Sequence, residues 1–226
     1  MSLISASEEF SNRYLYEVYS VKIQFREHVY GGTPKNPALL KGFVAAKTEH
    51  NDEQTEEQVT LIRESLKGQE TDEKSWNGFP TTLDKGLFIW SRQIKAMFRE
   101  SATMLRITTE KRGSKQILQH GFEIKNPIDG GQRHYLDRFL PDGTFIGPIN
   151  VMTPQGPRAA IKQTDYCERA SLEFEIWVLK TEAKETRHVG KAEIIKMLTF
   201  AQENGLGAER SQGHGKFDVI EFSKSE

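Results

Sequence analysis

The sequence predicts a mixed α+β protein with an antiparallel sheet, and two patterns lead to this prediction. Apolar and polar residues alternate over residues 14–28 and 170–179, which is typical of strands that bury one face. Apolar residues recur every three or four positions over residues 91–106 and 190–204, which is typical of helices that pack on such a face. A chain of 226 residues is long enough to bury a substantial core.

The first strand is predicted over residues 14–28. Its apolar face points to the core, and its opposite face is polar and basic and consists of Lys22, Gln24 and Arg26. Residues 30–42 are predicted to form a loop, because a Gly-Gly pair, two prolines and an asparagine interrupt any regular element. Residues 49–67 are acidic and helical in pattern, and residues 68–86 read as another loop.

The best-defined helix is predicted over residues 91–106, with Ser91 as its N-cap. Its apolar residues form one face, and basic residues lie largely off that face: Arg92, Lys95, Arg99 and Arg106. Residues 117–125 are predicted to form a strand that turns Leu118, Phe122 and Ile124 inward.

The second half contains one long segment without a clear pattern. Residues 126–168 are rich in Gly and Pro and are predicted to be mostly irregular. A strand follows over residues 170–179, then a helix over 190–204 and a last strand over 216–222. The residues expected to be buried in the second helix are Ile194, Ile195, Leu198 and Ala201.

Without the insertions, the elements follow the order βαββαβ, which is that of a ferredoxin-like unit with an antiparallel sheet. We expect one domain over residues 1–226. Its core segments are expected at about 14–28, 91–125 and 170–222, and its loop and helical insertions at about 30–86 and 126–168.

The composition excludes several classes of protein. Hydrophobic residues make up 36% and charged residues 28%, which is too apolar for a disordered chain and too polar for a membrane protein. The first residues lack the pattern of a secretory signal, so a cytoplasmic protein is expected. A single cysteine, Cys167, excludes an intramolecular disulfide and a cysteine-based zinc site. No spacing indicates a metal site or a cofactor.

Charge is balanced overall, at −1, but it is unevenly distributed. Residues 49–73 hold nine acids and two bases, whereas residues 85–116 hold eight bases and two acids. A basic segment can bind phosphate even on a neutral protein, because salt screens charges beyond about 8–10 Å. The basic residues of this segment therefore have two interpretations: they solvate the surface of helices and turns, or they bind nucleic acid.

A glycine-rich segment carries the most information. Residues 204–217 read NGLGAERSQGHGKF, between the second helix and the last strand. Such a loop can approach a phosphate backbone closely and offer its N–H groups to it. It is neither a Walker loop nor a dinucleotide fingerprint, because both require the order strand, loop, helix. The candidate phosphate-binding residues are Gly205, Gly207, Arg210, Ser211, Gly213, His214, Gly215 and Lys216.

This arrangement resembles the RAMP superfamily of CRISPR-associated RNA-binding proteins. The resemblance rests on the pattern Gly-x-Gly-x-x-Arg-Ser-x-Gly-x-Gly-Lys-Phe after the helix, and on a first helix that opens with Ser91 and carries Lys and Arg. The close matches cover about fifty residues. The resemblance implies a compact backbone subunit that grips single-stranded guide RNA and assembles with copies of itself and with other effector subunits. Phosphates would be held by the loop and by Arg92, Lys95 and Arg99, and the open sheet face would be lined by Lys22 and Arg26.

Two alternatives remain open. One is a metal-independent endoribonuclease that processes guide precursors, for which His28 is the first candidate catalytic residue. The other is a protein of a mobile element that keeps the fold and binds an effector complex without RNA. Some backbone subunits cut target RNA with an aspartate in the loop after the first strand, but residues 28–42 contain no Asp or Glu.

A few other residues have weaker signals. His134 lies with Arg133 and Arg138 in the predicted irregular insertion, where it could contact RNA. Loop aromatics can stack on unpaired bases, although they more often anchor a loop to the core. The candidates for stacking are Tyr30, Trp76, Tyr135 and Phe139. Cys167 is expected to be a packed thiol.

Overall fold

A computed structural model describes residues 15–45, 59–60, 62–64, 76–107, 114–153, 156–180 and 189–225. In these residues the protein is a mixed α+β structure with several antiparallel strand pairs. The central sheet has four strands in the order β12-β1-β11-β7, and each neighbouring pair is antiparallel. The strands are β1 (Tyr16–Phe25), β7 (Phe122–Lys125), β11 (Ser171–Leu179) and β12 (Phe217–Lys224).

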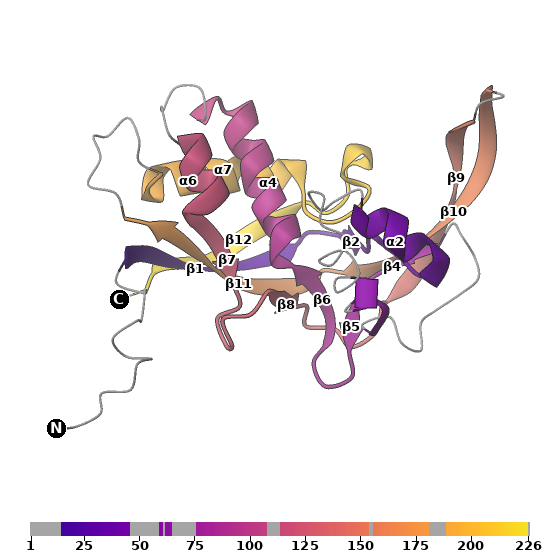
Figure 1. The fold of residues 1–226 in the computed structure, drawn as a ribbon, viewed down its shortest axis with the longest axis horizontal. Helices are drawn as coiled ribbons and strands as arrows, with labels where there is room; N and C mark the ends of the chain where they lie inside the picture. The colour runs from indigo at the N-terminus through magenta and orange to yellow at the C-terminus, as the bar shows by residue number, and fades with distance from the viewer. Residues whose placement is uncertain are drawn as a thin grey trace.

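The predicted alternation is present in the two central strands. In β1 the side chains of Val21, Ile23 and Phe25 are buried, and in β11 every second residue from Leu172 to Val178 is buried. Helices α4 (Ser91–Met104), α6 (Ser114–His120) and α7 (Lys191–Asn204) lie on one side of this sheet (Figure 1). Burial of apolar side chains between the helices and the sheet provides the main stabilisation of the core.

The chain order of these elements matches the sequence expectation. β1, α4, β7, β11, α7 and β12 follow one another as strand, helix, strand, strand, helix and strand. Two details differ. Trp90 rather than Ser91 is the N-cap of α4, and its N–H donates to the Gln93 side chain at 3.0 Å. In α7, Ile195 is 43% exposed, because it follows the buried Ile194 by one residue and so turns away from the core.

The prediction of a loop over residues 30–42 was wrong in its second half. The structure has strands β2 (His28–Tyr30) and β3 (Thr33–Pro34), then helix α2 (Pro37–Ala45). The Asn36 side chain accepts a hydrogen bond from the N–H of Ala38 at 2.9 Å, so Asn36 caps the helix. Pro37 begins the helix, where its missing N–H has no cost.

The segment 117–125 is not one strand. Its first residues belong to helix α6, and only β7 is extended. The three side chains expected to face inward, Leu118, Phe122 and Ile124, are all buried. Burial was therefore predicted correctly, while the short apolar run at residues 117–118 did not distinguish a helix from a strand.

The irregular insertion expected over residues 126–168 is largely strand. It contains β8 (Arg133–Tyr135) and a long hairpin of β9 (Gly143–Thr153) and β10 (Gly156–Glu168). The hairpin forms an arm that extends away from the helices at one end of the molecule (Figure 1). Ile146 and Ile161 in the arm are both more than 60% exposed, so no buried face imposes alternation on its sequence.

The base of the arm belongs to a second sheet. Its order is β2-β10-β4-β3, with β9 paired to β10 and β4 at Trp76–Gly78. A third sheet joins β5 (Thr81–Thr82), β6 (Gly86–Trp90) and β8. Strands β4 and β5 fall where a loop was expected over residues 68–86, and β6 begins at the last residue of that range.

The acidic segment lies mostly outside the described residues. Of the helix expected over residues 49–67, residues 59–60 and 62–64 are described, and they are helical. In the described part of the chain, no helix is long and apolar enough to cross a membrane.

Candidate nucleic-acid interface

The glycine-rich loop runs from the end of α7 to the start of β12. Gly205, Gly207, Gly213 and Gly215 all have positive φ, between 76° and 99°. Three of these glycines are required by close contact with neighbouring backbone. A Cβ on Gly215 would lie 2.0 Å from the Leu206 carbonyl oxygen, and Cβ atoms on Gly205 and Gly207 would lie within 3 Å of backbone oxygens.

Gly213 differs from the other three. A Cβ there would meet nothing within 4 Å, so Gly213 is needed for its turn and has open space beside it. The sequence predicts that all four glycines allow close approach of a phosphate. In the structure, Gly205 and Gly215 pack against the loop's own backbone and Gly207 packs against Tyr30 of β2, whereas Gly213 leaves room for a ligand.

The loop is joined to the neighbouring strand β2. The N–H of Ala208 donates to the Tyr30 carbonyl at 3.0 Å, and the N–H of Gly215 donates to the His28 carbonyl at 2.9 Å. The N–H of Leu206 donates to the carbonyl of Gly215 at 2.9 Å and so closes the loop on itself. This places His214 beside His28 and Tyr30 of β2, and the short 3₁₀ helix η3 (Arg210–Gln212) lies within the same loop.

The cations of the loop lie beside carboxylates from other segments. Arg210 donates to Glu100 of α4 at 2.6 Å, and Lys216 lies 3.3 Å from Glu203 of α7. Burial acts to raise the pKa of Glu100, but the hydrogen bond from Arg210 opposes it and the pKa is lowered overall. Ser211 is exposed.

Arg26 takes part in the same group of charges. It donates to Glu203 at 2.6 Å and to Asp218 at 3.0 Å. The hydrogen bond from Arg26, followed by that from Lys216, lowers the pKa of Glu203. All these groups are at least partly exposed, so solvent screens the pairs and a phosphate can compete for the cations.

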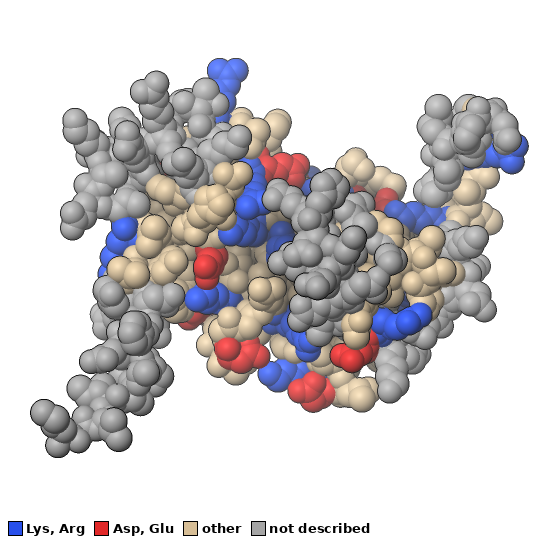
Figure 2. Space-filling model, viewed as in Figure 1, with Lys and Arg blue, Asp and Glu red and all other residues tan. Residues whose placement is uncertain are grey.

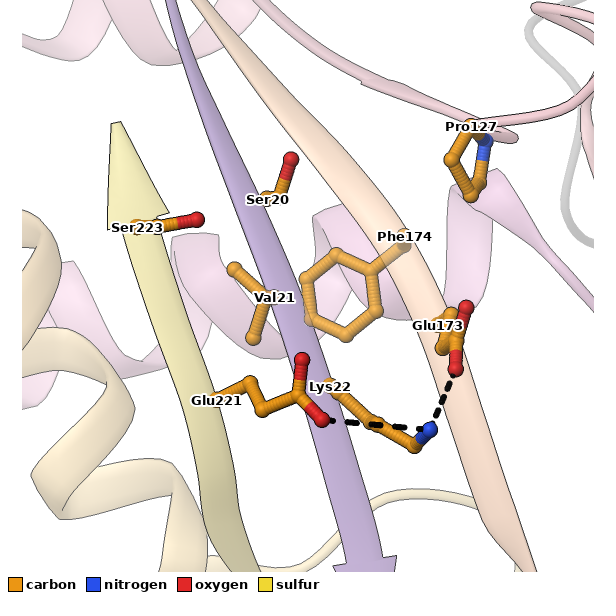
Figure 3. A pocket seen from close by; sticks show the side chains of 8 residues that line it. All are labelled: Ser20, Val21, Lys22, Pro127, Glu173, Phe174, Glu221 and Ser223. Carbon is orange, nitrogen blue, oxygen red and sulfur yellow. Dashed lines mark ion pairs between the residues drawn. The ribbon is translucent and has the colours of Figure 1, made fainter. Parts of the chain in front are cut away.

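The open face of the central sheet is not the basic surface expected there. Lys22 lies 2.7 Å from Glu173 and 3.9 Å from Glu221, so its charge is shared with two carboxylates (Figure 3). The hydrogen bond that Lys22 donates to Glu173 is the largest cause that raises the pKa of Lys22. At this position the face carries more negative than positive charge.

A second group of cations lies on α4. Arg92, Lys95 and Arg99 are spaced by three and four residues and so share one side of the helix. Lys and Arg side chains follow the exposed side of α4 in Figure 2. The Nζ of Lys95 donates to the Gln119 carbonyl of α6 at 3.1 Å, whereas Glu100 turns to the glycine-rich loop. The loop and these cations therefore lie toward different sides of α4 and do not form one continuous row.

Aromatic rings gather where the glycine-rich loop meets the base of the arm. The centroids of His28 and Tyr166 are 4.7 Å apart, and those of Tyr30 and His214 are 4.6 Å apart. Phe145 contacts Tyr30 from β9 and is 46% exposed. We call His28, Tyr30, Phe145, Tyr166 and His214 the aromatic cluster. Sequence reasoning named its two histidines and Tyr30 but missed Phe145 and Tyr166, because strand pairing across more than 100 residues brings them there.

A cavity of about 210 Å³ opens beside this cluster. It is lined by Arg26, His28, Gly213, His214 and Lys216, among others. His28 Nε2 lies 3.3 Å from a carboxylate oxygen of Glu168, and the ring centroids of His28 and His214 are 6.5 Å apart. The cavity therefore combines two imidazoles, two cations and loop backbone with the carboxylate of Glu27, and these groups can contact a phosphate and an attached base or sugar.

The expectation that His134 contacts RNA was wrong. His134 lies in β8 and its side chain is fully buried. Burial lowers the pKa of His134 to about 4. Its ring bonds Ser91 on one side and approaches the Glu173 carbonyl on the other. The residue holds α4 against the sheet and has no access to solvent.

The other three aromatic residues expected to stack on bases differ in how far they are exposed. Trp76 is half-buried and its Nε1 donates to Asp165 at 2.8 Å, so it anchors β4 to β10. Tyr135 packs on Phe88, with Lys85 over its ring. Phe139 is exposed.

Cys167 is buried, and burial raises the pKa of its thiol to about 12, as expected of a packed thiol. Among the described residues, no group of three or more His, Cys, Asp or Glu side chains could hold a metal ion.

Comparison with known proteins finds solved structures of similar fold, but no matching family. No protein-family model matches the chain, and no curated protein matches it. The fold is similar to a chain in the cryo-EM structure of the Type III-B Cmr-beta bound to cognate target RNA, at 13% sequence identity and a TM-score of 0.49. The alignment covers 97% of this chain but only 64% of that chain. At this level of similarity the two chains need not share a function, so function has to be inferred from the residues of this chain.

Proposed function

We propose that this chain is an RNA-binding subunit of the RAMP type, which grips single-stranded guide RNA within a CRISPR-like ribonucleoprotein. The strand order β12-β1-β11-β7, with α4 and α7 on one side, supports the ferredoxin-like unit that this assignment requires. The observation that carries the proposal is the closed glycine-rich loop, because it brings His214 into the aromatic cluster and Lys216 to the cavity beside it. Arg210 belongs to the same loop and lies beside Glu100 of α4.

In the proposed mechanism, RNA phosphates compete with carboxylates for the same cations. Arg210 leaves Glu100 and binds a phosphate instead. Lys216 and Arg26 leave Glu203 in the same way. The open space at Gly213 admits the backbone, and exposed rings of the aromatic cluster stack on unpaired bases. Arg92, Lys95 and Arg99 hold phosphates on the other side of α4. Contacts to the phosphates and to the faces of the bases do not depend on the nucleotide sequence of the RNA.

The test is RNA affinity at several salt concentrations. Binding of a labelled single-stranded RNA should weaken steeply with salt, because each phosphate contact releases counterions. Arg210→Ala should lower the affinity about tenfold, the size of one charge-assisted hydrogen bond. Lys196→Ala removes an exposed cation of α7 and serves as the matched control, with little effect expected. If folded Arg210→Ala binds RNA like wild type, the loop is not the binding element.

The partners that follow from this proposal are further copies of the chain and other subunits of the complex. Size-exclusion chromatography with light scattering, with and without guide RNA, tests assembly. A larger particle that forms only with RNA supports a backbone subunit. A chain that stays monomeric on saturating RNA contradicts assembly but not RNA binding.

A second candidate function is metal-independent cleavage of RNA. The observation in its favour is that His28 and His214 line one cavity with their rings 6.5 Å apart. One imidazole would take the proton of a 2′-hydroxyl, whose oxygen then attacks the phosphorus. The other would protonate the departing 5′-oxygen. Discrete products in EDTA that disappear in His28→Ala would establish this activity, and intact RNA after incubation with the wild type would exclude it.

A further inference from the structure

A cavity separate from the glycine-rich loop lies at the start of α4. Its volume is about 350 Å³, and it opens between α4, β7 and the turn at residues 127–132. Three cations line it, Arg92 and Lys95 of α4 and Lys125 of β7, together with one carboxylate, Glu123. Glu123 lies 3.3 Å from Lys125, so the cavity carries net positive charge and favours an anion.

Burial adds to this preference for an anion. Desolvation by burial is the largest cause that lowers the pKa of both Arg92 and Lys95, and the charge of Arg99 lowers that of Lys95 further. A phosphate in the cavity would offset both effects. Arg92 also lies 5.3 Å from the centre of the Trp90 ring, which orients its guanidinium.

Ser91 also lines this cavity, and its contact with His134 fixes what its hydroxyl can do. His134 Nδ1 lies 3.4 Å from the Glu173 carbonyl oxygen, which can only accept a hydrogen bond. In a neutral imidazole, Nδ1 then carries the proton and Nε2 is the acceptor. Ser91 Oγ lies 2.8 Å from Nε2, so the single proton of the serine hydroxyl is donated to the histidine.

Ser91 therefore presents only lone pairs to the cavity. An oxygen in this state accepts a hydrogen bond but cannot donate one to a phosphate. The complementary ligand has an anionic group for the three cations and, next to it, a hydroxyl that donates to Ser91. A ribonucleotide has both, because its 2′-hydroxyl lies near the phosphodiester, whereas a deoxyribonucleotide lacks the donor.

We propose that the cavity between α4 and β7 binds one ribonucleotide unit and distinguishes RNA from DNA. Arg92, Lys95 and Lys125 hold the phosphate, and Ser91 Oγ accepts a hydrogen bond from the 2′-hydroxyl. This inference rests on the proposed RNA binding and adds the sugar as the group that is recognised. His134 is a positioning residue, because it reaches the ligand only through Ser91.

The experiment compares three probes of one sequence without U or T: RNA, DNA and 2′-fluoro RNA. A 2′-fluorine keeps the sugar pucker of RNA but cannot donate a hydrogen bond. This probe therefore separates the effect of the hydrogen bond from the effect of the sugar conformation. Wild type should bind RNA about 3- to 10-fold more tightly than either other probe, the size of one hydrogen bond. Ser91→Ala should bind all three probes with the affinity that wild type has for DNA. Thr103→Ala removes an exposed hydroxyl of the same helix and should behave like wild type.

The outcomes separate failure of sugar recognition by Ser91 from failure of RNA binding by the chain. Equal wild-type affinity for RNA and 2′-fluoro RNA overturns the role of Ser91, even if Ser91→Ala fails to fold. Equal loss of RNA and DNA affinity in Ser91→Ala also overturns it, and in both cases RNA binding by the chain stands. Absence of binding to every probe at low salt overturns the proposed function itself.

Discussion

At the scale of single residues, the structure gives each cation of the glycine-rich loop a carboxylate partner. Arg210 and Glu100 are 110 positions apart in the sequence, so the pair could not be predicted from local spacing. Sequence reasoning identified the residue types that bind phosphate. It could not show that carboxylates already contact them. In the proposed mechanism, competition between these carboxylates and phosphates sets the affinity for RNA.

Glu100→Gln tests that competition directly. The change removes a negative charge that opposes RNA and a competitor for Arg210, so RNA affinity should rise about threefold or more. The melting temperature should change little, because exposed ion pairs contribute at most about 1 kcal/mol. Glu221→Gln, which removes a partner of Lys22 on the open sheet face, is the control and should leave the affinity near that of wild type. Identical gains in the two variants would show a general charge effect instead.

The buried His134 should make the free energy of unfolding depend on pH. Its pKa is about 4 in the folded protein and about 6.5 in the unfolded chain. Between these values the unfolded chain binds a proton that the folded protein does not, so stability is complete above pH 6.5 and is lost as the pH falls toward 4. The loss should be about 2–3 kcal/mol between pH 7 and pH 4.5.

Urea unfolding at both pH values measures this loss. The variant His134→Asn lacks the titrating group, so its stability should depend less on pH by that amount, whatever its stability at pH 7. Equal pH dependence in both proteins would mean that carboxylates and other histidines account for the whole effect.

At the scale of elements, the sequence predicted best where an element has one buried face. β1, β11, α4 and α7 all pack one face into the core, and each lies close to its expected range. The hairpin β9–β10 was missed because its exposed side chains give no periodic signal. Helix α2 was missed because Asn36 and Pro37 read as a break in the chain, although together they begin a helix.

The exposure of the arm leads to a prediction about stability. Gly147 pairs with Lys162 in the hairpin, and Pro148, Arg158, Ala159 and Ile161 beyond this pair are exposed. Replacement of residues 148–161 by an Asn-Gly turn between Gly147 and Lys162 should therefore leave the core folded. The melting temperature should change by less than about 4 °C, which corresponds to about 1 kcal/mol for a chain of this length. A loss of cooperative melting would show that the arm is part of the core.

At the scale of the whole molecule, charge is separated along the chain while the total stays near zero. The acidic segment 49–73 has nine acids and the basic segment 85–116 has eight bases. We expect the acidic segment to limit binding of unrelated RNA through long-range repulsion. Changing its acids to Asn and Gln should raise nonspecific RNA affinity at low salt and have little effect above about 0.5 M salt, where the Debye length is only a few ångströms. Unchanged affinity at low salt would contradict this role.

The closed glycine-rich loop has a further consequence. Both of its ends are tied by backbone hydrogen bonds, from Leu206 to Gly215 and from the loop to β2. A loop held in this way has already lost most of its conformational entropy on folding, so a ligand does not have to order it. When RNA binds at the loop, the protein should therefore lose little conformational entropy. Most of the conformational entropy lost on binding should come from the RNA.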